Sequence, residues 1–201
     1  MNFDIVVQAL WIILPAYAAN ASAVIVGGGK PIDGGKTWRD GKRILGDGKT
    51  WNGLFAGTFM GMTVGFALVF TAKYLDLNGL NIFRLNDFGG FPIMFPIVFS
   101  ICFGGLCGDV IESFFKRRIG KERGEDWFVF DQLDFVFGAI FFSSIISFVL
   151  HISGLTSTNW FIENITIWHL IVIVIITPFL HILANKIYKK TKKFTGRSLL
   201  F

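Results

Sequence analysis

Five long apolar segments most constrain what this chain can fold into. They span residues 3–26, 51–72, 89–115, 131–150 and 165–188. A helix needs about 20 apolar residues to cross the hydrocarbon core of a bilayer, and each segment is long enough. Helices also satisfy their backbone hydrogen bonds internally, as the bilayer interior requires. The sequence therefore predicts an all-α, polytopic membrane protein with five transmembrane helices, in which residues 1–201 form a single integral membrane domain.

The composition agrees with a location in the cell membrane. Hydrophobic residues make up 53% of the chain, and its 24 Phe and 6 Trp suit lipid contact and the interfacial belts of a membrane. The formal net charge is +5, which is small for 201 residues, and we expect no nucleic-acid partner.

The distribution of lysine and arginine predicts the orientation. Of the 19 Lys and Arg residues, 17 fall in loop 27–50, in loop 116–130 or from residue 186 onward. Only Lys73 and Arg84 lie on the opposite side. Positively charged loops stay in the cytoplasm, so we expect the N-terminus outside and both charged loops and the C-terminus in the cytoplasm. Loops 27–50 and 116–130, which carry most of the candidate functional residues, would then face the cytoplasm, where nucleotides are available.

Four glycines recur at a spacing of four in the second apolar segment: Gly53, Gly57, Gly61 and Gly65. A stripe of small residues lets another helix approach closely in a membrane. Packing within the chain is favoured, and a homodimer contact is the alternative.

Asp109 is an ionisable residue inside a predicted membrane helix, which marks it as a candidate functional residue. Ser113 and Lys116 lie within about 40° of it around the helix, so the three share one face, and Glu112 lies next to that face. Near the C-terminal end of a helix the dipole disfavours an anion. Asp109 therefore needs a cation, a metal or water. A structural salt bridge to Lys or Arg is the alternative to a functional role.

Asp131 and Asp134 open the next apolar segment, across a basic run from Asp109. Mg²⁺ takes oxygen ligands and often binds through one or two carboxylates together with substrate phosphates. Carboxylates at membrane depth beside many cations therefore suggest a metal ion that holds a polyphosphate. Helix capping is the alternative for Asp131 and Asp134, and binding of anionic lipid head groups is the alternative for the basic run. That run comprises Lys116, Arg117, Arg118, Lys121 and Arg123.

Loop 27–50 is rich in glycine and charge. Its Gly48-Lys49-Thr50 resembles the end of a P-loop, but Arg43 stands where the motif requires glycine and no strand precedes it. A glycine-rich loop with Lys42, Arg43 and Lys49 is still able to cradle phosphate through backbone N–H groups. An ordinary flexible loop is the alternative.

Taken together, these motifs resemble the CDP-archaeol synthases, which are related to bacterial CDP-diacylglycerol synthases. The resemblance covers almost the whole chain and is carried by residues 14–17, 20, 27–33, 40–51, 108–109, 113–118, 123–124 and 131–135. The superfamily pattern Ser-x-x-Lys-Arg, followed by Asp-x-x-Asp, is present as Ser113-x-x-Lys116-Arg117 and Asp131-x-x-Asp134. Bacterial enzymes carry His-Gly-Gly before the acidic pair, where this chain has residues 127–130.

The resemblance implies an Mg²⁺-dependent enzyme, with room for a second cation, that transfers CMP from CTP to an isoprenoid ether-lipid phosphate. It implies Asp109 and Asp131 as metal ligands with Asp134 beside them, and Lys116 and Arg117 as catalytic phosphate contacts. The implied substrate or nucleotide contacts are Ser113, Arg118, Arg123, Lys42, Arg43, Asp47, Lys49 and Thr50. A small ion-coupled transporter, and another lipid-phosphate transferase or kinase, are the alternatives.

Overall fold

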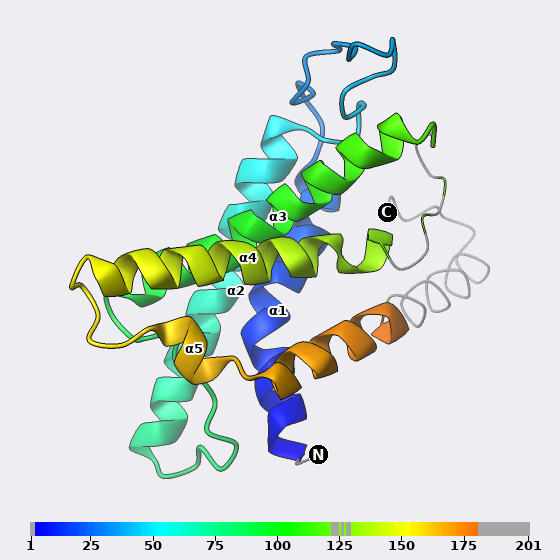
Figure 1. The fold of residues 1–201 in the computed structure, drawn as a ribbon. Coiled ribbons are helices and arrows are strands. Elements are labelled where there is room, and N and C mark those ends of the chain that lie inside the picture. The colour runs from blue at the N-terminus through cyan, green and yellow to red at the C-terminus, as the bar shows by residue number, and fades with distance from the viewer. Residues whose placement is uncertain (1–2, 122–124, 126, 128–129, 181–201) are drawn as a thin grey trace, which may run out of the picture.

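The computed structural model describes residues 3–121, 125, 127 and 130–180, and the regular elements of this part are helices. Four are long and apolar enough to cross a membrane: α1 (Phe3–Val26), α2 (Trp51–Leu77), α3 (Met94–Arg118) and α4 (Phe130–Ile152). A short helix α5 (Trp160–Asn164) and the apolar helix Ile167–Leu180 follow (Figure 1). The protein is therefore a helical membrane protein.

The predicted fifth span, residues 165–188, lies partly outside the described residues. Its described part is the helix Ile167–Leu180, which is shorter than a full membrane crossing. The count of five spans stays a prediction.

The second helix, expected over 51–72, continues to Leu77. The third helix also differs from the expected 89–115, because it begins at Met94 and continues through Lys116 and Arg117 to Arg118. Lysine and arginine are good helix formers and are favoured in a last turn, where the helix dipole is negative.

The glycine stripe of α2 packs against α1 within the same chain. A Cβ added to Gly57 would lie 2.9 Å from Ala23 Cβ, and one added to Gly61 would lie 2.6 Å from Ala19 Cβ. Only glycine permits these approaches. Internal packing, the favoured reading of the stripe, is therefore confirmed, and the homodimer stays a prediction.

A second set of glycines brings α3 and α4 together. A Cβ on Gly108 would collide with the backbone of Asp134, and one on Gly138 would collide with the backbones of Gly104 and Gly108. The two helices therefore cross with their backbones almost in contact. Because Asp109 directly follows Gly108 in the chain, this crossing places its carboxylate beside that of Asp134.

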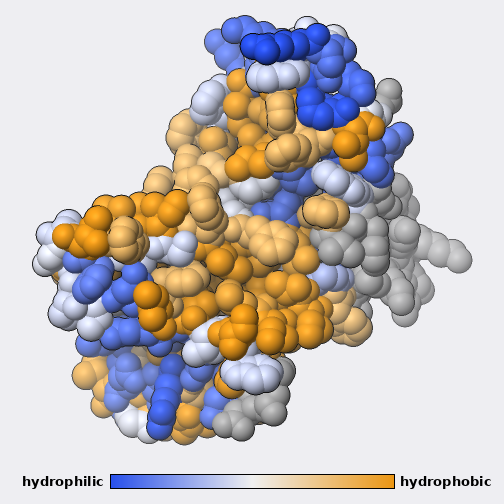
Figure 2. Space-filling model, in the orientation of Figure 1, coloured by the Kyte–Doolittle hydropathy of each residue, from blue (hydrophilic) through white to orange (hydrophobic). Residues whose placement is uncertain are grey.

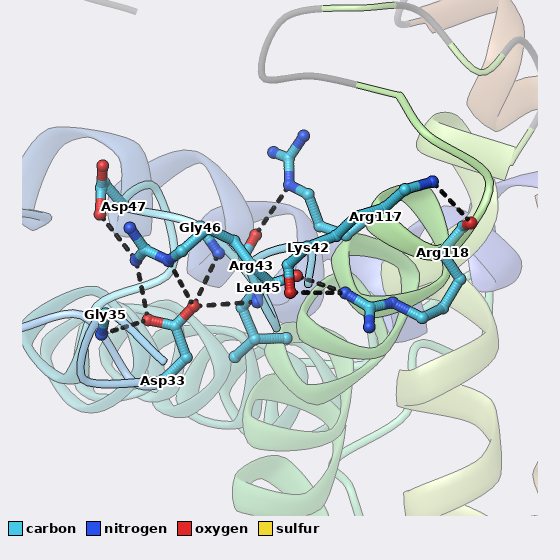
Figure 3. A network of polar contacts seen from close by, with 9 residues as sticks. All are labelled: Asp33, Gly35, Lys42, Arg43, Leu45, Gly46, Asp47, Arg117 and Arg118. Carbon is cyan, nitrogen blue, oxygen red and sulfur yellow. Dashed lines mark hydrogen bonds and ion pairs between the residues drawn. The ribbon is translucent and has the colours of Figure 1, made fainter. Parts of the chain in front are cut away.

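Loop 27–50 is an ordered structure built around Asp33, whose side chain is fully buried. One carboxylate oxygen accepts hydrogen bonds from Leu45 N and Gly46 N at 3.0 Å, and the other accepts one from Gly35 N at 2.9 Å. Arg43 donates from its guanidinium to both oxygens (Figure 3). Burial by itself would raise the pKa of Asp33, but the hydrogen bonds from Arg43 and the backbone outweigh it and hold the pKa well below its usual range.

Polar and apolar surfaces are separated along the molecule. Loop 27–50 and the end of α3 lie at one end, while the N-terminus and the connection between α2 and α3 lie at the other (Figure 1). In the space-filling view, hydrophilic residues gather at both ends and a broad hydrophobic surface lies between them (Figure 2). Large apolar side chains on the membrane-length helices α2 and α4, such as Phe59, Phe137 and Phe141, are exposed. Such a surface belongs in lipid and would be unstable in water.

Candidate active site

A cavity of about 580 Å³ opens between loop 27–50 and the helices beneath it. The end of α1, the start of α2, the last turns of α3 and the first turn of α4 all contribute to its wall. Most of the residues predicted for the site are found there. Those lining the cavity are Asp47, Lys49, Thr50, Asp109, Ser113, Lys116, Arg117, Asp131 and Asp134.

Three carboxylates converge at the base of the cavity. Oxygen atoms of Asp109, Glu112 and Asp134 all lie within 4.8 Å of one another. Asp109 and Glu112 come from α3, three residues apart on neighbouring faces, and Asp134 comes from α4 across the glycine crossing. In the described part of the chain, this is the one group of three or more acidic, histidine or cysteine side chains close enough together to hold a metal ion.

Asp109 has a cationic partner. Lys49 Nζ lies 2.6 Å from both carboxylate oxygens of Asp109 and reaches them from loop 27–50. The salt bridge considered from the sequence as an alternative is therefore present. Both side chains keep 23% of their surface exposed, so this pair faces the cavity and is open to solvent.

Asp131 is held by different groups. Its Oδ2 accepts hydrogen bonds from Lys116 Nζ at 2.7 Å and from the backbone N–H of Trp127 at 2.9 Å. Lys116 Nζ also lies 3.6 Å from Glu112 Oε1, so one ammonium group bridges two acids. Asp131 lies in the first turn of α4, but the N–H that it accepts from belongs to Trp127, before the helix begins, and is not one of the free first-turn N–H groups that a cap satisfies. Its role as a metal ligand stays a prediction.

The donor set fits a hard divalent cation. The four acids Asp109, Glu112, Asp131 and Asp134 carry two more negative charges in their ionised forms than Lys49 and Lys116 neutralise. Glu112 Oε1 and Asp131 Oδ1 are buried oxygens that accept no hydrogen bond from the described residues. Buried unsatisfied carboxylate oxygens are costly, and oxygen ligands are what Mg²⁺ prefers.

The basic residues divide into two groups. Arg117 lines the cavity while donating to the carbonyls of Leu45 and Lys121, at 3.2 and 2.6 Å. Arg118 does not line the cavity and binds Asp40 at 2.8 Å. It also donates to the carbonyl of Arg43 (Figure 3). The end of α3 is thereby tied to loop 27–50.

Three more predicted contacts lie away from the cavity wall or beyond the described residues. Lys42 Nζ donates to the Arg118 carbonyl at 3.3 Å. Arg43 is paired with Asp33 and Asp47 at 2.9 and 2.8 Å, and the two hydrogen-bonded carboxylates raise its pKa. Arg123 lies outside the described residues. The direct substrate contacts predicted for these residues stay predictions.

An apolar groove of about 860 Å³ adjoins the polar cavity. Its wall comes from α3, α4 and the helix Ile167–Leu180, and includes Phe115, Phe137 and Phe141. Glu112 and Asp134 line both the groove and the cavity. A molecule with a charged head and apolar tails therefore fits across the junction, with its head at the carboxylates.

Glu112 was not among the residues predicted for the site, although it completes the acidic group. Its spacing of three from Asp109 places the two on neighbouring faces, which is a signal the sequence contains. Asn20 of α1 also lines the cavity. Asn20 is one of the residues that carry the family resemblance in the sequence, but no role in the site was predicted for it.

Comparison with known proteins identifies the family. The CarS-like family, described as CDP-archaeol synthase, matches residues 2–193. A CDP-archaeol synthase of Methanosarcina barkeri is 41% identical over 179 residues, covering 86% of this chain and 92% of the relative. One from Thermococcus kodakarensis is 37% identical over 177 residues, covering 88% and 87%.

A solved structure of similar fold agrees with this assignment. It is described as an intramembrane enzyme for archaeal membrane lipid biosynthesis and is 32% identical, with a TM-score of 0.64. The match covers 90% of this chain and 94% of the other. With the family match across nearly its whole length, this chain belongs to the CDP-archaeol synthase family.

Proposed function

We propose that the protein transfers CMP from CTP to the phosphate of an isoprenoid ether lipid, the unsaturated archaetidic acid precursor. The products are CDP-archaeol and pyrophosphate, in archaeal phospholipid biosynthesis. The relatives' names support this activity. The observation that carries it is the junction of a polar cavity and an apolar groove at Glu112 and Asp134. Such a junction allows a lipid phosphate to meet a nucleotide triphosphate while the lipid tails stay in an apolar environment.

The reaction is a displacement at the α-phosphorus of CTP. An oxygen of the lipid phosphate forms a bond to that phosphorus, and the bond to the bridging oxygen of the β-phosphate breaks, releasing pyrophosphate. A phosphate monoester has a second pKa near 6, so the nucleophile is largely dianionic at neutral pH and needs no strong base. The obstacle is the repulsion between two polyanions. Positioning and charge stabilisation therefore supply the catalysis.

The residues around the cavity suit that task. Lys116 and Arg117 stabilise the charge that builds up on the leaving pyrophosphate, while Asp47, Thr50 and Ser113 lie on the wall available to the nucleotide. Asp109, Glu112 and Asp134 would hold Mg²⁺, which supplies charge neutralisation to the triphosphate. Lys116 holds Oδ2 of Asp131 at 2.7 Å, so Asp131 would offer its other oxygen, Oδ1, to a second cation.

The apolar groove would hold the lipid tails. Phe115, Phe137 and Phe141 form a surface that faces the hydrophobic exterior and leads to the carboxylates. The tails then stay in lipid while only the phosphate enters the polar cavity. This avoids the cost of moving long apolar chains through water.

The proposal also includes the orientation inferred from the lysine and arginine counts. Loop 27–50 and the end of α3 meet at one end of the molecule, as Lys42 and Arg118 show by their contact. With this end in the cytoplasm, the cavity opens toward CTP and the N-terminus lies outside. The transporter reading is not favoured, because the relatives are named as synthases.

Pyrophosphate release by the purified protein in detergent tests the proposal. With CTP and Mg²⁺, release should require an acceptor lipid, should be faster with the geranylgeranyl ether phosphate than with diacyl phosphatidate, and should stop on chelation. Absence of release with either lipid from folded protein would contradict the proposal.

A further inference from the structure

The side chain of Lys49 enters the carboxylate group from a rigid backbone. Ile32 N donates to the Lys49 carbonyl at 2.8 Å, and Trp51 N donates to the Lys30 carbonyl at 3.2 Å. Next to Lys49, Thr50 caps α2 by accepting a hydrogen bond from Gly53 N at 3.1 Å. The backbone at position 49 is therefore held on both sides. Any movement of the ammonium group must come from its four-carbon side chain.

The ammonium group lies where a metal ion would bind Asp109. It contacts both oxygens of that carboxylate at 2.6 Å, and one of them belongs to the group of three oxygens, from Asp109, Glu112 and Asp134, that lie within 4.8 Å of one another. Mg²⁺ binds carboxylate oxygen at 2.0–2.1 Å. A divalent cation at that distance and an ammonium group on the same two oxygens would repel each other strongly. Lys49 and the metal thus compete for Asp109.

The other lysine of the site is placed differently. Lys116 lies on α3 and contacts Asp131 and Glu112, at 2.7 and 3.6 Å. It has no contact with Asp109 among the described residues, and its side chain is less exposed than that of Lys49, 13% against 23%. Of the two lysines, Lys49 is therefore the one whose ammonium group is free to move away from the carboxylates into the solvent-exposed cavity.

We propose that Lys49 is an exchangeable counter-ion of the metal site. In the absence of metal it neutralises Asp109, and when the metal binds it turns to the phosphates of the nucleotide in the same cavity. When the metal binds without nucleotide, the ammonium group of Lys49 loses its contact with Asp109 and gains no phosphate in exchange. When the nucleotide is also bound, its phosphates replace Asp109 as the partner of that ammonium group. Metal and CTP therefore bind synergistically, and each tightens the other by the same factor. This inference rests on the proposed function for the identity of the nucleotide.

Binding of Mn²⁺ to the detergent-purified protein, measured by electron paramagnetic resonance with and without CTP, tests the exchange without relying on turnover. Lys49→Met should bind Mn²⁺ alone at least about tenfold more tightly than the wild type, because one competing positive charge is gone. CTP should tighten Mn²⁺ binding in the wild type and do so much less in the variant. Lys36→Met removes an equal charge from an exposed position in the same loop and should match the wild type.

Equal or weaker binding of Mn²⁺ alone to Lys49→Met would overturn the proposal. Should that variant fail to fold, amine labelling of the wild type gives a second measurement. Labelling of Lys49, read by mass spectrometry against Lys36, should rise with saturating Mn²⁺ and fall again on adding CTP. If saturating Mn²⁺ left the labelling of Lys49 unchanged, the proposal that the metal displaces Lys49 from Asp109 would be overturned. A protein that exchanges as expected but releases no pyrophosphate would contradict only the proposed function.

Discussion

At position 109 a carboxylate lies near the C-terminal end of a membrane helix, where the dipole gives it no support. The structure shows one compensating group, the ammonium of Lys49 from loop 27–50. Two further acids beside Asp109 add negative charge, and the three together suit a metal ion. The sequence pointed to Asp109 because a charge inside an apolar segment is visible without a structure. Glu112 was missed because it lies among the charged residues at the helix end, where a solvated acid is ordinary.

Asp109→Asn and Glu112→Gln should each keep the fold but lose metal binding and lower turnover by at least about 100-fold, because charge stabilisation is the main catalytic contribution. Asp4→Asn removes an equal charge at an exposed position far from the site and should behave as the wild type. Pyrophosphate release together with Mn²⁺ binding would check this. Near-normal turnover in a folded Asp109→Asn protein would refute the metal role.

Asp33 allows a prediction about pH. Its pKa in the folded protein lies below the roughly 3.9 of an unperturbed aspartate. The ionised side chain therefore stabilises loop 27–50 at every pH above about 4, and this stabilisation is lost only as pH falls through the folded pKa. Asp33→Asn places an NH₂ group against backbone N–H donors. Protection of the Leu45 and Gly46 amides should fall by about 1–3 kcal/mol.

Hydrogen exchange, corrected for the intrinsic rate at each pH, measures that protection. The difference between the wild type and Asp33→Asn should stay constant from pH 8 to pH 5 and shrink only below about pH 4. Asp76→Asn, at the end of α2 remote from the loop, serves as the control. A difference that disappears between pH 7 and pH 5 would show that the pKa of Asp33 is not lowered.

Among the elements, the glycine contacts decide where the site forms. The stripe on α2 could be recognised from its spacing of four. Gly104, Gly108 and Gly138 could not be paired from sequence, because they lie on two helices whose crossing point no local pattern reveals. The same limit applies to the end of α3. Apolar periodicity stops at the basic residues, but the helix continues through Arg118 since nothing in that segment breaks it.

Gly108→Ala should separate α3 from α4, because its Cβ collides with the Asp134 backbone. We expect the free energy of unfolding to fall by about 1–3 kcal/mol. We expect turnover to fall by more than this loss of stability explains, because the carboxylates of Asp109 and Asp134 move apart. Gly105→Ala is the graded comparison, because its Cβ would lie 3.3 Å from the Phe135 carbonyl and need only a small adjustment. Thermal unfolding and turnover of both variants test whether Gly108→Ala is more damaging than Gly105→Ala. If Gly108→Ala lowered stability and turnover no more than Gly105→Ala does, the close backbone contact between α3 and α4 at Gly108 would be contradicted.

On the scale of the whole molecule, the sequence predicted a helical membrane protein with two charged loops near a set of acids. The apolar lengths and the charge asymmetry carry that information. The meeting of a polar cavity with an apolar groove at Glu112 and Asp134 was not predictable. It depends on how α3, α4 and the helix Ile167–Leu180 lie in space, and exposed phenylalanines look alike in sequence whether they line a groove or face lipid.

The groove makes a prediction about the lipid substrate. Phe141→Gln should raise the KM for the lipid several-fold and leave the KM for CTP unchanged, because a polar side chain in the groove opposes burial of apolar tails. Phe148→Gln is the matched control on the same helix, since Phe148 is similarly exposed but lies outside the groove. Steady-state kinetics with lipid in mixed micelles gives both constants. An equal effect of the two substitutions would contradict the groove as the tail site.

The fate of the individual phosphates of CTP tests the central claim most directly. Purified protein would be incubated with Mg²⁺, the ether-lipid phosphate, and CTP labelled at either the α- or the γ-phosphorus. Cytidylyl transfer predicts that the α-label moves into the lipid phase while the γ-label leaves as pyrophosphate. A γ-label on the lipid would identify a kinase, and no transfer of either label by folded protein would contradict the account.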